Sequence, residues 1–147
     1  MQKKSQDKSI NRIIDANINR AKEGLRVCEE ITRFILSNRK LTTEFKTTRH
    51  QINSIVSELP IKKTEILEAR NSLEDIGEDI YINELKRKNV YDVFFANMQR
   101  IKESVRVLEE FSKLLDKNSA LKFKSVRYAV YEIEKEAVKK IPALYNT

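Results

Sequence analysis

The chain has few of the residues that make turns, with only two glycines and two prolines among 147 residues. Folds built from β-hairpins need many of both, because tight turns use glycine at positive φ and proline at a fixed φ. Lys, Glu and Leu are abundant instead, and these residues favour helices. We therefore predict an all-α fold, and the length predicts one helical domain over residues 1–147.

The single cysteine, Cys28, excludes an internal disulfide and is typical of a reducing compartment. Its position on an apolar helix face indicates a small buried residue. No stretch approaches the ~20 apolar residues that a transmembrane helix needs, and "MQKKSQDKS" is not followed by an apolar run of signal-peptide type. We expect a cytoplasmic protein that does not bind a membrane.

The chain also lacks the short motifs of well-known nucleotide-binding and hydrolytic sites. Two glycines cannot supply GxxxxGK[ST] or GxGxxG, and neither HExxH nor a paired-cysteine metal site occurs. The formal charge of +7 invites a nucleic-acid interpretation, but 22 acidic residues are mixed among 29 basic ones. Zinc-finger and RNA-binding aromatic motifs are absent too, so we expect no nucleic-acid partner. A basic pocket for a phosphorylated small molecule would give the same charge excess.

The sequence does contain one stretch twice: "DANINRAKEGLRVCEE" at 15–30 and "FANMQRIKESVRVLEE" at 95–110. The matched residues of the first copy, mostly polar, are Ala16, Asn17, Arg20, Lys22, Glu23, Arg26, Val27, Glu29 and Glu30. Their counterparts are Ala96, Asn97, Arg100, Lys102, Glu103, Arg106, Val107, Glu109 and Glu110. Packing alone preserves an apolar pattern and lets polar residues vary. The repeated polar residues therefore indicate either a binding site or a buried polar network.

The repeat extends into the following helix, because "EFKTTRHQI" at 44–52 matches "KFKSVRYAV" at 122–130. Periodicity and capping residues predict helices over residues 9–38, 42–59, 63–70, 89–115 and 120–140. A two-helix unit thus occurs as a first repeat at 9–59 and a second at 89–140, joined by a bridge at 60–88. We predict a closed bundle with an approximate internal two-fold axis, near which equivalent residues converge.

Two polar residues of the first copy, Asn17 and Arg20, fall within the apolar arc of a helical wheel, and Glu23 lies at its edge. A buried arginine is costly unless its charge is met. One interpretation is an Asn/Arg/Glu network that fixes the bundle register through i,i+3 pairs. The other is a shared cleft in which Arg20 and its counterpart bind an anion, since Arg suits bidentate phosphate recognition. The residues of this candidate site are Asn17, Arg20, Glu23, Asn97, Arg100 and Glu103.

The loop "EARNSLEDIGED" interrupts the regular pattern and adds Arg70 and Asp75 to the candidates. Asp75 and Glu23 are the predicted ligands of a metal ion. His50, the only histidine, could act as a general base or bind phosphate, although a lone histidine or a charged turn is also common without function. The remaining predicted phosphate-binding residues are Arg49 and Arg127, which match in the repeat.

The strings "RIIDANINRAKEGLRVCEE", "RH", "R…DIG" and "RVLEEF…RYAVYEIEK" resemble a known family over about residues 11–135. It is the small all-helical hydroxymethylpyrimidine-phosphate kinase family of the second type, found alone or fused N-terminal to thiamin-phosphate synthase. The synthase barrel is missing here, which resembles the free-standing form. Asn71 departs from the family pattern, where an acidic residue is expected.

The resemblance implies ATP- and Mg²⁺-dependent phosphorylation of 4-amino-5-hydroxymethyl-2-methylpyrimidine phosphate to the diphosphate, in thiamin biosynthesis. Its implied partners are the pyrimidine phosphate, a nucleotide and thiamin-phosphate synthase, with a homo-oligomer also compatible. The alternative is a non-catalytic helical module that binds a thiamin precursor or the synthase. Residue roles come from the repeated polar face and the loop, and the predicted catalytic residues are Arg20, Glu23, His50 and Asp75. We expect the chemistry near the first copy and the loop, with the second copy positioning substrate.

Overall fold

The computed structural model describes residues 2–79 and 85–141. These residues form helices and turns, with no strand among them, which confirms the predicted all-α single domain. The α-helices are α1 (Gln2–Glu30), α2 (Arg39–Glu58), α3 (Lys63–Glu68), α4 (Val90–Ser112) and α5 (Lys117–Lys140). A π-helical turn, Ile31–Ile35, continues α1, and a 3-10 turn, Ser72–Glu74, follows α3.

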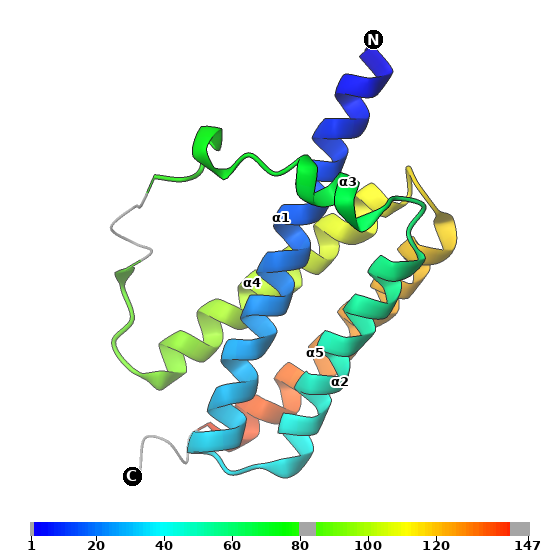
Figure 1. Ribbon diagram of the computed structural model, residues 1–147. Coiled ribbons are helices and arrows are strands. Elements are labelled where there is room, and N and C mark those ends of the chain that lie inside the picture. Colours follow the sequence, from blue (N-terminus) through cyan, green and yellow to red (C-terminus); the bar gives the residue numbers. More distant parts are fainter. Residues whose placement is uncertain (1, 80–84, 142–147) are drawn as a thin grey trace.

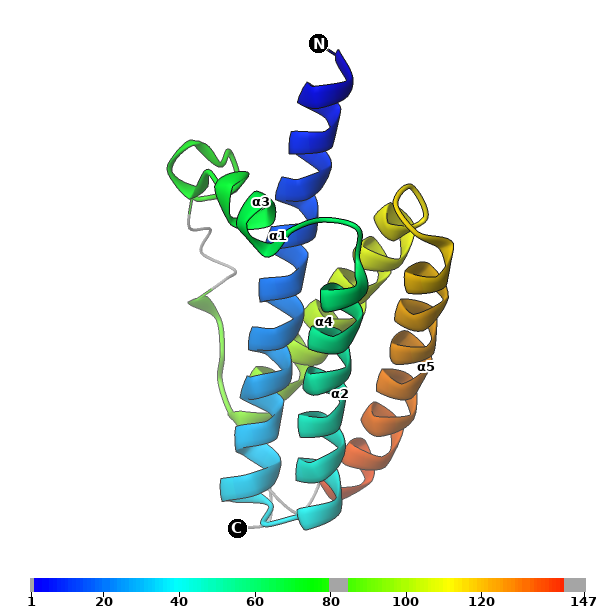
Figure 2. The same ribbon diagram turned by 45° about the vertical axis from the view of Figure 1, so that its right-hand side comes forward.

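The four long helices form a bundle in which α1 packs against α4 and α2, and α5 packs against α4 and α2. Figures 1 and 2 show that each long helix runs antiparallel to both of these neighbours. Helix α2 ends and α4 begins at opposite ends of the bundle, and α3 follows α2 beside α1 (Figure 1). Within the described part of the chain, none of the helices is both long and apolar enough to cross a membrane.

Side-chain caps set the beginnings of three long helices. Asn38, Asn89 and Asp116 each accept a hydrogen bond from a backbone N–H of the first turn, at 2.9, 2.9 and 3.3 Å. The start of α4 at Val90 agrees with the helix predicted over residues 89–115. The predicted start of the first helix at residue 9 was wrong, because α1 begins at Gln2.

The core lies between the four long helices and includes three fully buried phenylalanines. Phe45 of α2 and Phe94 of α4 meet edge to face, with ring centroids 6.2 Å apart. Helix α1 lies close to α4 at Gly24: a Cβ there would lie 3.2 Å from the Asn97 carbonyl oxygen and 2.9 Å from a side-chain carbon of Ile101. The glycine leaves the room that this close crossing needs.

A buried glutamate ties the two helices of each repeat together. Glu29 of α1 accepts from Arg49 of α2 at 3.2 Å, and Glu109 of α4 accepts from Arg127 of α5 at 2.9 Å. Arg26 and its counterpart Arg106 pair with the same two glutamates, at 3.2 and 3.4 Å. These corresponding contacts fit a duplication, although the superposition of the two copies stays a prediction.

One hydroxyl pair is present in the first copy only. Thr32 of the π-helical turn lies 3.0 Å from Thr42 of α2, oxygen to oxygen. The counterpart of Thr32 is Ser112, and Ala120 stands where Thr42 stands in the first copy. The buried Ser112 hydroxyl accordingly has no hydrogen-bond partner among the residues that the structure describes.

Candidate active site

A pocket of about 660 Å³ lies between the outer side of α1 and the segment that follows α3. Four residues predicted from the sequence line it together: Asn17, Arg20, Arg70 and Asp75. Its other lining residues are Ser9, Arg12, Ile13, Asp15, Ala16, Asn19, Asn71 and Ser72. The first copy of the repeat and the loop after α3 therefore share one pocket, as the sequence predicted.

An ion pair anchors the segment after α3 to α1. Arg70 donates from Nε to Asp15 Oδ2 at 2.8 Å and from Nη2 to Asp15 Oδ1 at 2.7 Å. These hydrogen bonds and the negative charge of Asp15 raise the pKa of Arg70, and the charge of Glu23 adds to this effect. Sequence reasoning missed Asp15, because the second copy has Phe95 at the matching position and the repeat therefore did not mark it.

Asn17 is buried at the edge of the pocket and connects the helix to Arg20. Its Nδ2 donates to the Ile13 carbonyl at 2.8 Å, and its Oδ1 accepts from Arg20 Nη1 at 3.5 Å. In the second copy, Asn97 makes the same backbone contact, to the Val93 carbonyl at 2.8 Å. The two asparagines thus have matching conformations.

Arg20 and Arg100 are both exposed, so the prediction that they are withdrawn from solvent on an apolar face was wrong. Helix α1 packs mainly against α4 and α2, and its most buried residues include Ile14 and Leu25. The apolar arc of the helical wheel was centred roughly a quarter turn from the face that is buried, on a side where Ala16 is only partly buried. Arg100 is not among the described residues that line the pocket.

Glu23 and Glu103 are exposed on the same helices. In the described part of the chain, neither forms the i,i+3 ion pair with Arg20 or Arg100 that a register-fixing network would need. That structural interpretation of the repeated residues is therefore not supported. Glu23 is not among the described residues that line the pocket, although its negative charge contributes to the raised pKa of Arg70.

Asp75 holds a tight turn at the pocket, where its Oδ1 accepts a hydrogen bond from the Gly77 N–H at 2.9 Å. Among the described residues, no three His, Cys, Asp or Glu side chains gather as a metal site. Magnesium, however, is commonly held by one or two carboxylates together with substrate phosphates. The carboxylate of Asp75, at the pocket and exposed, suits that arrangement, and the predicted metal role of Asp75 and Glu23 stays a prediction.

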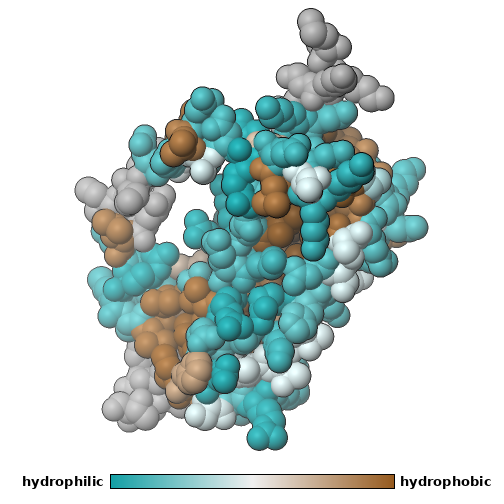
Figure 3. Space-filling model, viewed as in Figure 1, coloured by the Kyte–Doolittle hydropathy of each residue, from teal (hydrophilic) through white to brown (hydrophobic). Residues whose placement is uncertain are grey.

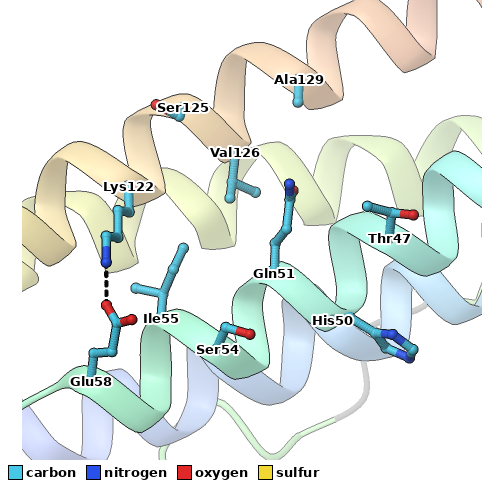
Figure 4. Close-up of a pocket in the computed structure, with 10 residues that line it drawn as sticks. All are labelled: Thr47, His50, Gln51, Ser54, Ile55, Glu58, Lys122, Ser125, Val126 and Ala129. Carbon is cyan, nitrogen blue, oxygen red and sulfur yellow. Dashed lines mark hydrogen bonds and ion pairs between the residues drawn. The ribbon is translucent and has the colours of Figure 1, made fainter.

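His50, Arg49 and Arg127 do not belong to this pocket. His50 lies on α2 and lines a separate pocket of about 490 Å³ between α2 and α5, which the ion pair of Glu58 and Lys122 borders. Figure 4 shows its ring directed away from α5. Arg49 and Arg127 are used in the buried ties to glutamates, with side chains only 18% and 11% exposed. The predicted catalytic residue His50 and the predicted phosphate-binding residues Arg49 and Arg127 therefore do not gather with Arg20 in this pocket.

Comparison with known proteins assigns the chain to a family. Residues 12–136 match the sequence profile described as the ThiD2 family. The chain belongs to the ThiD2 family. This match confirms the family predicted from the repeated strings and covers most residues of the pocket on α1. No solved structure matches the chain.

Similar curated proteins carry the name thiamine-phosphate synthase. One from Synechocystis sp. is 39% identical over 127 residues, which cover 86% of this chain and 35% of the relative. One from Nostoc punctiforme is 38% identical over 134 residues, covering 90% and 36%. One from Rhodopirellula baltica is 33% identical over 141 residues, covering 95% and 37%. This ThiD2 chain thus spans little more than a third of the length of these relatives.

Proposed function

We propose that the chain acts in thiamin biosynthesis and transfers the terminal phosphoryl group of ATP to 4-amino-5-hydroxymethyl-2-methylpyrimidine phosphate. The family and the thiamine-phosphate synthases among its relatives support the pathway. The observation that carries the reaction is the pocket on α1, in which arginines and one exposed carboxylate face the same space. The arginines suit the binding of two phosphate compounds, and the carboxylate suits the binding of a magnesium ion.

The balance of charge in the pocket favours anions. Arg70 is neutralised by Asp15, whereas Arg12 and Arg20 have no carboxylate partner among the described residues. Two arginines are therefore available for phosphate oxygens, which they bind with paired N–H groups. The pocket volume of about 660 Å³ lies within the range of sites that hold a small organic ligand.

The transfer needs positioning and charge neutralisation more than proton transfer. An oxygen of the pyrimidine monophosphate forms a bond to the γ-phosphorus of ATP, the bond from that phosphorus to the bridging oxygen breaks, and ADP leaves. The second pKa of a phosphate monoester is about 6, so the attacking oxygen is already deprotonated near neutral pH. No general base is required, and the location of His50 outside the pocket is compatible with the reaction.

Each pocket residue has a definable task in this scheme. Arg20 would neutralise charge on the transferring group, where such donors lower the barrier most. Asp75 would offer a carboxylate oxygen to Mg²⁺, which would neutralise phosphate charge during the transfer. The pair of Arg70 and Asp15 would keep the Asp75 segment against α1.

The test uses the purified chain with ATP, Mg²⁺ and the pyrimidine monophosphate, followed for ADP and for the diphosphate. Arg20→Ala should lower kcat/KM on the order of a hundredfold, as loss of one preorganised donor does. Arg39→Ala, which removes the same charge from the exposed start of α2, should leave kcat/KM within about twofold. Absence of diphosphate with the wild-type chain would contradict the kinase.

The second candidate is a non-catalytic module that binds a thiamin precursor or thiamine-phosphate synthase. It is favoured by one observation, that the relatives matched over most of this chain carry the name thiamine-phosphate synthase and are about two and a half times as long. Calorimetry with the pyrimidine monophosphate, and co-elution with a purified synthase, would detect this role. Binding in either experiment without ADP production would support the module over the kinase.

A further inference from the structure

Most of the repeated charged residues separate into two sets in the structure; Lys22 and Lys102, of which Lys102 pairs with Glu134 at 3.0 Å, belong to neither. One set forms the ties and their flanking ion pairs, and its members are Arg26, Glu29, Glu30, Arg106, Glu109 and Glu110. The other set is exposed and has no ion-pair partner among the described residues: Arg20, Glu23, Arg100 and Glu103. Packing and salt bridges account for the first set. They do not account for four unpaired charged residues that recur at the same positions in both copies.

The second set lies around the crossing of α1 and α4. The crossing is fixed by Gly24, whose added Cβ would lie 3.2 Å from the Asn97 carbonyl oxygen. Arg20 precedes Gly24 by four residues and Arg100 follows Asn97 by three, so each shares a helix face with its crossing residue. At a rise of 1.5 Å per residue, both arginines lie about 5–6 Å along their helices from the crossing.

The two arginines can reach a common space outside the bundle. Helices that pack closely have axes about 8–10 Å apart, and both arginines are exposed, hence directed away from the core. Extended arginine side chains can span that separation from either side. A phosphate group held by Arg20 and one held by Arg100 could therefore approach to the distance of about 3–3.5 Å that a reaction requires.

We infer that Arg100, with Asn97 and Glu103, forms a second phosphate half-site, equivalent to that of Arg20, Asn17 and Glu23. Each half-site holds one of the two phosphorylated compounds, and the two compounds meet at the α1–α4 crossing. This inference rests on the proposed kinase function and assigns its two substrates.

The surroundings decide which compound binds where. The first half-site opens into the pocket with Arg12, Arg70 and the Asp75 carboxylate, so it suits the larger, magnesium-bound triphosphate. The second half-site has one exposed arginine and lies beside no described counterpart of the Asp75 turn. It suits the pyrimidine monophosphate, whose single phosphate a bidentate arginine can hold.

The experiment measures two dissociation constants for each variant by calorimetry, with the full chain and Mg²⁺. The probes are the pyrimidine monophosphate and β,γ-imido-ATP, which cannot transfer its terminal group. Arg20→Ala should raise the dissociation constant of the nucleotide analogue by about tenfold to a hundredfold, and Arg100→Ala should raise that of the monophosphate by a similar factor. Arg39→Ala is the matched control and should change neither constant by more than about twofold.

The outcomes separate this inference from the kinase itself. If each variant loses affinity for a different compound, the result supports two half-sites. Any other pattern contradicts them. If the wild-type chain produces diphosphate while both variants lose the same compound, the half-sites fail and the kinase stands. If the wild-type chain binds both compounds but produces no diphosphate, the kinase fails, and the variants still decide the half-sites. If the wild-type chain binds only one of the two compounds, both the two half-sites and the kinase function are contradicted.

Discussion

The ion pair of Arg70 and Asp15 should couple the stability of the domain to the shape of its pocket. The Asp15 side chain is 10% exposed and that of Arg70 is 45% exposed, and two short hydrogen bonds join them. A hydrogen bond to a charged group contributes about 1.5–3 kcal/mol. Because solvent screens the half-exposed guanidinium, we expect a coupling free energy of about 1–2 kcal/mol for the pair.

A double-mutant cycle measures this coupling. Arg70→Gln should lower the free energy of unfolding by about 2 kcal/mol, because Asp15 then keeps only the amide of Asn19, at 3.4 Å, among its described hydrogen-bond donors. Asp15→Asn should lower the free energy of unfolding by less, since no buried charge is left without a partner. The double variant should be more stable than the sum of the single losses predicts, by the coupling free energy.

The assay is urea unfolding followed by far-UV circular dichroism, with the Michaelis constants of the kinase reaction measured on the same preparations. The exposed pair of Glu110 and Lys113 at the end of α4, at 2.9 Å, is the control, and its cycle should give a much smaller coupling free energy. Both Michaelis constants should rise in the Arg70 variant, because the Asp75 segment is no longer held against α1. A coupling below about 0.3 kcal/mol for Arg70 and Asp15 would refute the anchoring role.

Three further predictions follow from single features of the structure. Asp75→Asn should lower turnover about tenfold or more and raise the Mg²⁺ concentration needed for half-maximal rate, as measured by a magnesium titration of ADP production. Thr32→Val should cost about 1 kcal/mol in urea unfolding, because it removes a satisfied buried hydroxyl, whereas Ser112→Ala should be neutral or stabilising. Cys28 should resist a thiol reagent in the native chain and react on unfolding, because burial raises the pKa of its thiol; rapid native labelling would contradict this.

Local signals were sufficient to predict the helices and most of their ends. The asparagine at 89, the break at Asp116 and the proline after Leu59 act within one turn of the chain, so the sequence shows them directly. The helix faces were harder to predict. A helix in a bundle contacts two neighbours, and a single apolar arc does not show which pair of directions is buried. For that reason Arg20 was placed on the apolar face, although it is exposed.

The candidate site was predicted in part, for a similar physical reason. The repeat marked Asn17 and Arg20, and the irregular loop marked Arg70 and Asp75, and these four line one pocket. Asp15 could not be found in this way, since its partner lies 55 residues away and the pair has no equivalent in the second copy. Contacts between distant segments depend on the path of the connection, which no local pattern encodes.

The two copies of the repeated stretch share internal supports but differ at the surface. The ties between helices are the same in both repeats, from Glu29 to Arg49 and from Glu109 to Arg127, so the scaffold has equivalent supports on either side of the crossing. The differences lie at the surface. Where Asp15 anchors the segment of the pocket, the second copy has Phe95, which is 46% exposed and stacks on a neighbouring tyrosine. An apolar ring cannot hold an arginine in a bidentate pair, so the second repeat cannot build the same pocket wall. In the proposed arrangement, the first half-site has this pocket wall and the second lacks it, while the buried ion pairs that support them are equivalent. This difference suits two substrates of unequal size and charge, because each is recognised differently and both are bound at the α1–α4 crossing.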